Sequence, residues 1–178
     1  MKQAYVIFDR DGTLIKHVHH LVNPDLVQFK NGLDTALRLL YKADFRFGII
    51  SNQSVIGRGL ATHLEIEMVN ARIVNFLKPL GIILDFVYYC PHLPNRGCKC
   101  RKPEIGLGRK AMIEHNLDPK MSFMIGDQES DMLFGRDLGC KTIQLQGDAK
   151  KSHFADYYSD TLESAAKWIL AEKDRGDF

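Results

Sequence analysis

An apolar run near the N-terminus breaks directly into an acidic loop, and this junction constrains the fold more than any other stretch. Ala4 to Phe8 is too short for a helix and rich in strand-favouring residues, and Asp9-Arg-Asp-Gly-Thr13 follows at once. The pattern is typical of a buried parallel strand that ends in a polar loop. Ligands bind beyond the carboxyl ends of strands in open α/β sheets, so we expect chemistry at this end. An ordinary turn is the alternative, because Asp, Gly and Thr favour turns.

The two acids of this loop, Asp9 and Asp11, stand two residues apart and can face one pocket. Magnesium suits such a pair, because it prefers oxygen ligands and completes its octahedron with waters and a phosphate oxygen. Gly12 allows a sharp turn and a close approach to a ligand. We therefore predict a magnesium-binding acidic pair.

The rest of the chain alternates between strand and helix patterns. Further strands are predicted over Arg46 to Ile50, Leu84 to Tyr89, Met121 to Ile125 and Lys141 to Leu145. Helical stripes run from Leu33 to Tyr41, Thr62 to Leu77, Ile105 to His115 and Leu162 to Leu170, and Glu172 to Phe178 are expected to fray. Alternation of this kind predicts a three-layer, Rossmann-like α/β fold with a parallel central sheet, in one domain spanning residues 1–178.

Composition points to no particular class of macromolecular partner. Apolar residues make up 45% of the chain and charged residues 26%, and the net charge of +2 gives no reason to expect nucleic acid or an anionic membrane. No apolar run is long enough for a membrane span or a signal-peptide core. We expect a cytoplasmic monomer whose partner is a small molecule.

Three of the four cysteines crowd one short stretch. Cys90, Cys98 and Cys100, with His92, supply three thiolates and one imidazole within eleven residues. Four such ligands complete a closed tetrahedral zinc site, which leaves no position for a reactive water. We predict a structural zinc loop at residues 90–100, with a redox-active or merely buried cysteine cluster as the alternative.

Polar groups also follow the other predicted strands. The second strand leads into Ser51-Asn-Gln-Ser54, the fourth leads into Gly126-Asp127, and Arg101-Lys102 follows the zinc loop directly. Each has an ordinary reading as a helix cap, a turn or a solvated basic pair. Their recurrence at strand ends makes them candidates for the same site as Asp9.

Together these stretches resemble the four motifs of the haloacid dehalogenase-like (HAD) phosphohydrolases, in the family's order and over nearly the whole chain. The resemblance implies that Asp9 is the nucleophile that becomes a phosphoaspartate and that Asp11 is the general acid and base. It implies that Ser51 and Lys102 stabilise the transferred phosphoryl group. It assigns magnesium to Asp9, Asp11 and Asp127, and makes Asp131 a helix-start or outer-shell residue. No long insertion follows the first two motifs, so we expect no large cap domain.

Within this family the zinc loop resembles the group that comprises heptose-bisphosphate and histidinol-phosphate phosphatases. Substrate contacts are then expected from Arg10 and Arg101, the latter for a second anionic group, and from His17, His19, His20, Asn52, Gln53 and Ser54. The stretch Ser51-Asn-Gln-Ser-Val-Ile-Gly-Arg-Gly59 agrees with the heptose enzymes, whereas the short zinc loop and Gln128 are less typical of them.

The resemblance therefore implies a phosphoric monoester hydrolase that removes the 7-phosphate of D-glycero-D-manno-heptose 1,7-bisphosphate, in the synthesis of nucleotide-activated heptose and lipopolysaccharide precursors. Histidinol phosphate is the alternative substrate. A non-catalytic zinc-binding adaptor is the alternative of another class, and it would not need both Asp9 and Asp11.

Overall fold

β1 (Tyr5–Phe8) lies near the centre of the sheet and pairs in parallel with β2 (Arg46–Asn52) on one side and β4 (Phe123–Gly126) on the other. The computed structural model describes residues 2–176. Their six-stranded, all-parallel sheet has the order β3-β2-β1-β4-β5-β6. The strands are β1 (Tyr5–Phe8), β2 (Arg46–Asn52), β3 (Leu84–Cys90), β4 (Phe123–Gly126), β5 (Lys141–Leu145) and β6 (Tyr157–Ser159).

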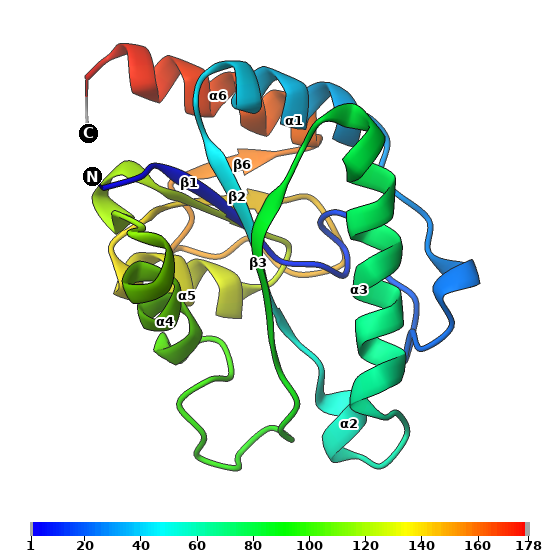
Figure 1. Ribbon diagram of the computed structural model, residues 1–178. Coiled ribbons are helices and arrows are strands. Elements are labelled where there is room, and N and C mark those ends of the chain that lie inside the picture. The colour runs from blue at the N-terminus through cyan, green and yellow to red at the C-terminus, as the bar shows by residue number, and fades with distance from the viewer. Residues whose placement is uncertain (1, 177–178) are drawn as a thin grey trace.

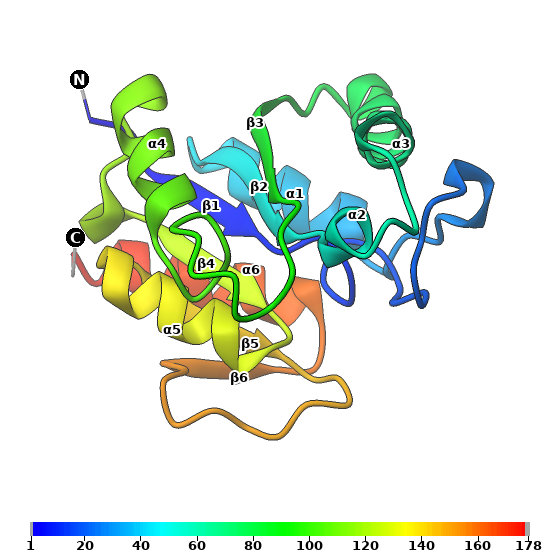
Figure 2. The same cartoon turned by 90° about the horizontal axis from the view of Figure 1, so that it is seen from below.

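Helices cover both faces of this sheet (Figures 1 and 2). They are α1 (Leu33–Lys42), α2 (Ser54–Gly57), α3 (His63–Leu77), α4 (Gly106–His115), α5 (Glu129–Leu138) and α6 (Leu162–Asp174), with 3₁₀ turns at Pro24–Leu26, Lys78–Leu80 and Pro119–Met121. Helices α1, α3 and α6 share one hydrophobic cluster, and α4 and α5 share the other. The expected three-layer α/β fold is confirmed.

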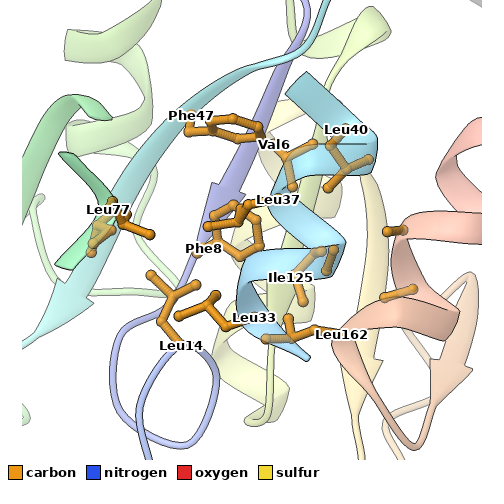
Figure 3. Close-up of a cluster of buried hydrophobic side chains, with 14 of the residues drawn as sticks. Val6, Phe8, Leu14, Leu33, Leu37, Leu40, Phe47, Leu77, Ile125 and Leu162 are labelled. Atoms are coloured by element: carbon orange, nitrogen blue, oxygen red, sulfur yellow. The ribbon is translucent and has the colours of Figure 1, made fainter. Parts of the chain in front are cut away.

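Alternate residues of β1 feed the two clusters, because successive side chains of a strand point to opposite faces. Val6 and Phe8 pack among Leu37 and Leu40 of α1, as Figure 3 shows, whereas Tyr5 and Ile7 face the opposite cluster. Every residue of β1 is buried. The nearly continuous apolar run that precedes Asp9 is thus the signature of a central parallel strand.

The chain order creates a crevice beside β1. From β1 the chain builds β2 and β3 outward on one side, then returns to build β4, β5 and β6 on the other. Neighbouring strands β1 and β4 therefore lie at the topological switch point, where α/β sheets bind ligands beyond their carboxyl ends. The loop between β3 and α4 also extends beyond this end of the sheet (Figure 1).

Most predicted elements are confirmed, including the capping box in which Thr62 and Glu65 start α3. Tyr41, expected on the buried stripe of α1, is 55% exposed. The fourth strand begins at Phe123 because residues 119–121 form a 3₁₀ turn capped by the Asp118 side chain. No helix among residues 2–176 is both long and apolar enough to cross a membrane.

The prediction that the chain frays from Glu172 is wrong for the residues that the structure describes. Helix α6 continues to Asp174, and the buried Glu172 carboxylate pairs with Lys141 and Arg175. Residues 177 and 178, which belong to the same prediction, lie outside the described residues. An ion pair to β5 across 31 residues gives no local signal in the sequence.

Candidate active site

Four segments meet at the carboxyl end of the sheet around a cavity of about 530 Å³. The loop after β1 contributes Asp9 and Asp11, and the loop after β4 contributes Asp127. Lys102, which follows the cysteine-rich loop, lines the same cavity. Ser51 is buried at the end of β2, where its hydroxyl accepts a hydrogen bond from Gln53. The four predicted motifs therefore lie close together in the folded chain.

Lys102 is the cation at the centre of this site. Its ammonium group is buried and donates to Asp9 Oδ1 at 2.6 Å and to the Ile50 carbonyl at 2.6 Å, and it pairs with Asp131 Oδ1 at 2.7 Å. Burial lowers the pKa of Lys102, but the charges and hydrogen bonds of Asp131 and Asp9 outweigh it and leave the pKa raised. Lys102 is therefore a permanent positive charge beside Asp9.

Asp9 experiences opposing influences. Burial raises the pKa of its carboxyl group, Lys102 lowers it, and Asp131 and Asp11 raise it, with a net value of about 7. The charge of Lys102 does not fully offset the effect of burial and of the neighbouring carboxylates on this pKa. An additional cation would favour the ionised form of Asp9, which is the form that can act as a nucleophile.

The donor set fits a hard divalent cation. Carboxylate oxygens of Asp9, Asp127 and Asp131 lie within 4.8 Å of one another. Asp127 Oδ1 is buried and has no hydrogen-bond partner among the described residues, and burial raises the pKa of this carboxyl group. An orphaned buried carboxylate oxygen in an oxygen-rich cluster suits magnesium.

Asp131 has the helix-start role that was expected of it. Its carboxylate accepts a hydrogen bond from the Gln128 main-chain N–H, in the capping box that starts α5. The same carboxylate also pairs with Lys102, so it helps to orient the ammonium group.

Arg10, for which a substrate contact was predicted, forms several hydrogen bonds within the protein. It is 1% exposed, and its guanidinium group donates to both carboxylate oxygens of Asp11, to Asn70 Oδ1 and to Gln53 Oε1. Gln53 in turn donates to Asp11 Oδ2 and to Ser51 Oγ. Arg10 and Gln53 therefore hold the Asp11 carboxylate in place, because their polar groups are committed inside the protein.

Asn52, also predicted to touch substrate, lines the cavity and ties the end of β2 to Lys102. Its side-chain amide donates to the Lys102 carbonyl and accepts from the Lys102 N–H, each at 3.0 Å. The adjacent Gln53 N–H donates to the Cys90 carbonyl at 2.7 Å. The main chain at Lys102 is thus positioned by the end of β2 across 50 residues of sequence.

The predicted zinc ligands come together in the loop after β3. Cys90 Sγ lies 3.6 Å from Cys98 Sγ and 3.3 Å from Cys100 Sγ, and His92 Nδ1 lies 3.2 Å from Cys100 Sγ. A tetrahedral zinc ion with Zn–S bonds of about 2.3 Å separates its sulfur ligands by roughly 3.8 Å. The four donor atoms therefore fit a closed zinc site with only a small outward adjustment.

The predicted substrate histidines line a second, smaller hollow. His17, His19, His20 and Ser54 border a space of about 220 Å³, together with Arg58. His17 also lines the catalytic cavity, as does Arg101, whose Nη1 donates to the His92 carbonyl at 3.3 Å. The predicted substrate residues are therefore distributed over two adjoining spaces.

Sequence reasoning gave no role to Asn70. It lies on α3, is 7% exposed and accepts a hydrogen bond from Arg10 Nη1 at 3.1 Å. The available signal was its place on the buried stripe of that helix, between Ile66 and Ile73, where a polar side chain requires a partner.

Comparisons with known proteins agree with this geometry. A family model described as HAD-hydrolase-like matches residues 99–165. D-glycero-β-D-manno-heptose-1,7-bisphosphate 7-phosphatase of Haemophilus ducreyi is 36% identical over 155 residues, which cover 82% of this chain and 84% of that protein. The chain belongs to the HAD-like phosphatase family.

Two further proteins are similar to different extents. The D,D-heptose 1,7-bisphosphate phosphatase from B. bronchiseptica, solved with magnesium and phosphate, matches with a TM-score of 0.83 and 25% identity, covering 96% of this chain and 99% of that one. The histidine biosynthesis bifunctional protein HisB of Campylobacter jejuni is 33% identical over 81% of this chain, but the match covers only 42% of HisB.

Proposed function

We propose that this chain is a magnesium-dependent phosphatase that removes the 7-phosphate of D-glycero-D-manno-heptose 1,7-bisphosphate. The reaction type rests on the buried Asp9 carboxylate, which is hydrogen-bonded at 2.6 Å to Lys102 and clusters with the Asp127 carboxylate. A carboxylate held beside a fixed cation can attack phosphorus while the cation offsets the charge of the phosphoryl oxygens.

In the first step, Asp9 attacks the phosphorus atom of the phosphate group at C7. A bond forms between its carboxylate oxygen and phosphorus, and the bond between phosphorus and the sugar oxygen breaks. Protonated Asp11 donates its proton to the departing sugar oxygen. Arg10 and Gln53 keep this carboxyl group oriented toward the cavity that it lines.

In the second step, water attacks the phosphoaspartate. Asp11 takes a proton from the water, the bond between phosphorus and Asp9 breaks, and inorganic phosphate leaves. Lys102 and the Ser51 hydroxyl stabilise the transferred group in both steps.

Magnesium, when bound, supplies positive charge against the phosphoryl oxygens. Asp9 and Asp127 are proposed as its carboxylate ligands. Asp11, whose carboxylate is held by Arg10 and Gln53 and which lines the same cavity, is the third proposed ligand.

Zinc is proposed as a structural ion held by Cys90, His92, Cys98 and Cys100. Four protein ligands fill a tetrahedral site, so the ion touches no substrate. Its role is to fix the loop that leads directly into Arg101 and Lys102.

The heptose substrate rests on the relatives' names and coverage and on the stretch from Ser51 to Gly59. Histidinol phosphate is the second candidate, favoured by the short zinc loop and by the similarity to HisB. Measuring kcat/KM for both substrates with magnesium decides between them. We expect a clear preference for the heptose bisphosphate, and a preference for histidinol phosphate would overturn the assignment.

A further inference from the structure

A buried amide on β5 lies beside the proposed magnesium ligand Asp127. Gln144 is 3% exposed and stands between Ile143 and Leu145, which are also buried. In the sheet it is paired with Gly126, the last residue of β4 and the one before Asp127. A polar side chain buried among apolar neighbours requires hydrogen-bond partners, so its partners indicate what it holds in place.

The amide group of Gln144 is engaged through both its nitrogen and its oxygen. Its Nε2 donates to the Asp127 carbonyl at 3.2 Å and to the Lys150 carbonyl at 3.0 Å, and its Oε1 accepts from the Ser152 N–H at 2.8 Å. The reverse orientation would place the amide oxygen against two carbonyl oxygens, so the partners fix which atom is the nitrogen. Gln144 therefore links Asp127 to the loop between β5 and β6.

Asp127 follows the last residue of β4 that is paired in the sheet. Its carbonyl accepts the hydrogen bond from Gln144, and the loop after β5 borders its side chain, because a Cβ added at Gly147 would lie 3.6 Å from Asp127 Cβ. Its Oδ1 has no hydrogen-bond partner among residues 2–176. The main chain of Asp127 is thus fixed while one carboxylate oxygen is left for a cation.

Thr142, two residues earlier on the same face of β5, holds the other end of this loop. Its hydroxyl donates to the Phe154 carbonyl at 2.7 Å and accepts from the Asp156 N–H at 3.2 Å. Within the described part of the chain, no hydrogen bond joins Thr142 to Asp127. The two positions therefore separate anchoring of the loop from contact with Asp127.

We propose that Gln144 is a positioning residue, which holds the Asp127 main chain so that the Asp127 carboxylate meets the magnesium ion. The inference rests on the proposed function, which makes Asp127 a ligand of that ion. Gln144 acts through Asp127 and touches neither substrate nor metal. Loss of a group that orients a metal ligand typically weakens metal binding about 10- to 100-fold. Loss of Gln144 should therefore weaken the site without abolishing it.

Mn²⁺ is the probe, because it takes the same oxygen ligands as Mg²⁺ and its free form is counted by electron paramagnetic resonance. The site is defined by the Mn²⁺ ion that the wild type binds and Asp127→Asn does not. Gln144→Met keeps the length of the side chain and removes its hydrogen bonds, so its Kd for Mn²⁺ should rise about tenfold. In Thr142→Val, which removes the hydroxyl at nearly constant volume, the Kd should change by less than about twofold.

Stability distinguishes this positioning role from a merely structural one. Both variants should melt at a lower temperature, because each leaves buried groups without a hydrogen-bond partner. Only Gln144→Met should bind Mn²⁺ more weakly. An unchanged Kd in folded Gln144→Met would overturn the inference. An equal rise in Thr142→Val would also overturn it, because any loosening of the loop would then have the same effect.

Gln144→Asn replaces Gln144→Met if the latter does not fold. This amide is one methylene shorter, so it keeps a buried polar group and withdraws the nitrogen from the Asp127 carbonyl. Its Kd for Mn²⁺ should also rise, and a wild-type Kd would overturn the inference.

Phosphate release separates the inference from the proposed function. A wild type that binds Mn²⁺ at Asp127 but releases no phosphate from the heptose bisphosphate contradicts the proposed function alone. An active wild type, with a Gln144→Met variant that binds Mn²⁺ equally tightly, contradicts only the role of Gln144. We expect Gln144→Met to need about tenfold more magnesium for half-maximal release and to regain most of the wild-type kcat at saturating magnesium.

Discussion

At the scale of single residues, the site depends on polar groups that have hydrogen-bond partners within the protein and on a few that lack them among residues 2–176. The Arg10 guanidinium group donates to the Asp11 carboxylate, and the Asn52 side chain forms hydrogen bonds with the Lys102 main chain. One buried carboxylate oxygen of Asp127 has no hydrogen-bond partner among residues 2–176. The first set provides orientation, and the unpartnered oxygen is the group that a cation would satisfy.

Gly12 allows the Asp127 carboxylate to occupy the space where a side chain would otherwise be. A Cβ added there would lie 2.5 Å from Asp127 Oδ2, and the φ of Gly12 is +85°. We expect Gly12→Ala to displace Asp127, weakening magnesium activation, and to cost about 1–2 kcal/mol of unfolding free energy from the left-handed backbone.

Gly81→Ala is the control for this prediction, because Gly81 has a φ of +73° and no atom within 4 Å of its added Cβ. Both variants should lose stability in denaturant titrations, but only Gly12→Ala should need more magnesium for half-maximal activity. An unchanged magnesium requirement in Gly12→Ala would contradict this account.

Glu172 links α6 to β5 and makes stability depend on pH. The hydrogen bond from Lys141 lowers the pKa of Glu172, and the charges of Lys141 and Arg175 add to this against the opposing effect of burial. A lowered folded-state pKa gives stability that is present above the unfolded value of about 4.3 and lost as the pH falls through the folded value.

We therefore expect Glu172→Gln to lower the unfolding free energy by about 0.5–1 kcal/mol at pH 7. Urea titrations should show that this difference shrinks as the pH falls below the ordinary range of a glutamate. Asp174→Asn, on the exposed side of the same helix, serves as the control. A deficit that is equally large in acid would contradict the ion-pair explanation.

At the scale of elements, the cysteine-rich loop and the end of β2 together position Lys102. The Gln53 N–H donates to the Cys90 carbonyl, the Gly57 N–H donates to the Pro91 carbonyl, and Asn52 bonds the Lys102 main chain. The loop is thus held at β2 as well as by its four metal-binding side chains. Its shape determines where Lys102 meets Asp9.

Removal of zinc should therefore lower both thermal stability and activity. The double variant Cys98→Ser, Cys100→Ser should contain no zinc, melt at a lower temperature and lose most of its kcat, because Lys102 is no longer held in one position. Cys140→Ala, which lies outside the loop, should keep one zinc ion per chain. Elemental analysis and phosphate release measure these outcomes, and full activity in the zinc-free protein would refute the coupling.

At the scale of the whole molecule, local patterns predicted the frame, while long-range contacts determined the roles of several residues. Strand β1, which ends just before Asp9, and the capping box of α3 can each be recognised from a short stretch of sequence. Strand β6 has three residues, Tyr157–Ser159, which is too short to carry a period. Helix α2 is likewise a single turn of four residues.

Two residues of the site have partners far away in the chain that the sequence did not indicate. The role of Arg10 depends on Asn70, 60 residues later, and that of Asn52 depends on Lys102, 50 residues later. Residue type and neighbourhood suggested substrate contacts for both. Only the folded structure shows that their polar groups are already occupied.

The central claim is that phosphoryl transfer takes place at the switch point between β1 and β4, with Asp9 as the nucleophile. Its most direct test is the release of inorganic phosphate from heptose 1,7-bisphosphate by the wild type and by Asp9→Asn, with and without magnesium. The amide has the shape of the carboxylate but is not a nucleophile, so the variant should fold normally and release no phosphate. The wild type should require magnesium. Substantial turnover by folded Asp9→Asn, with contamination and deamidation excluded, would contradict the account.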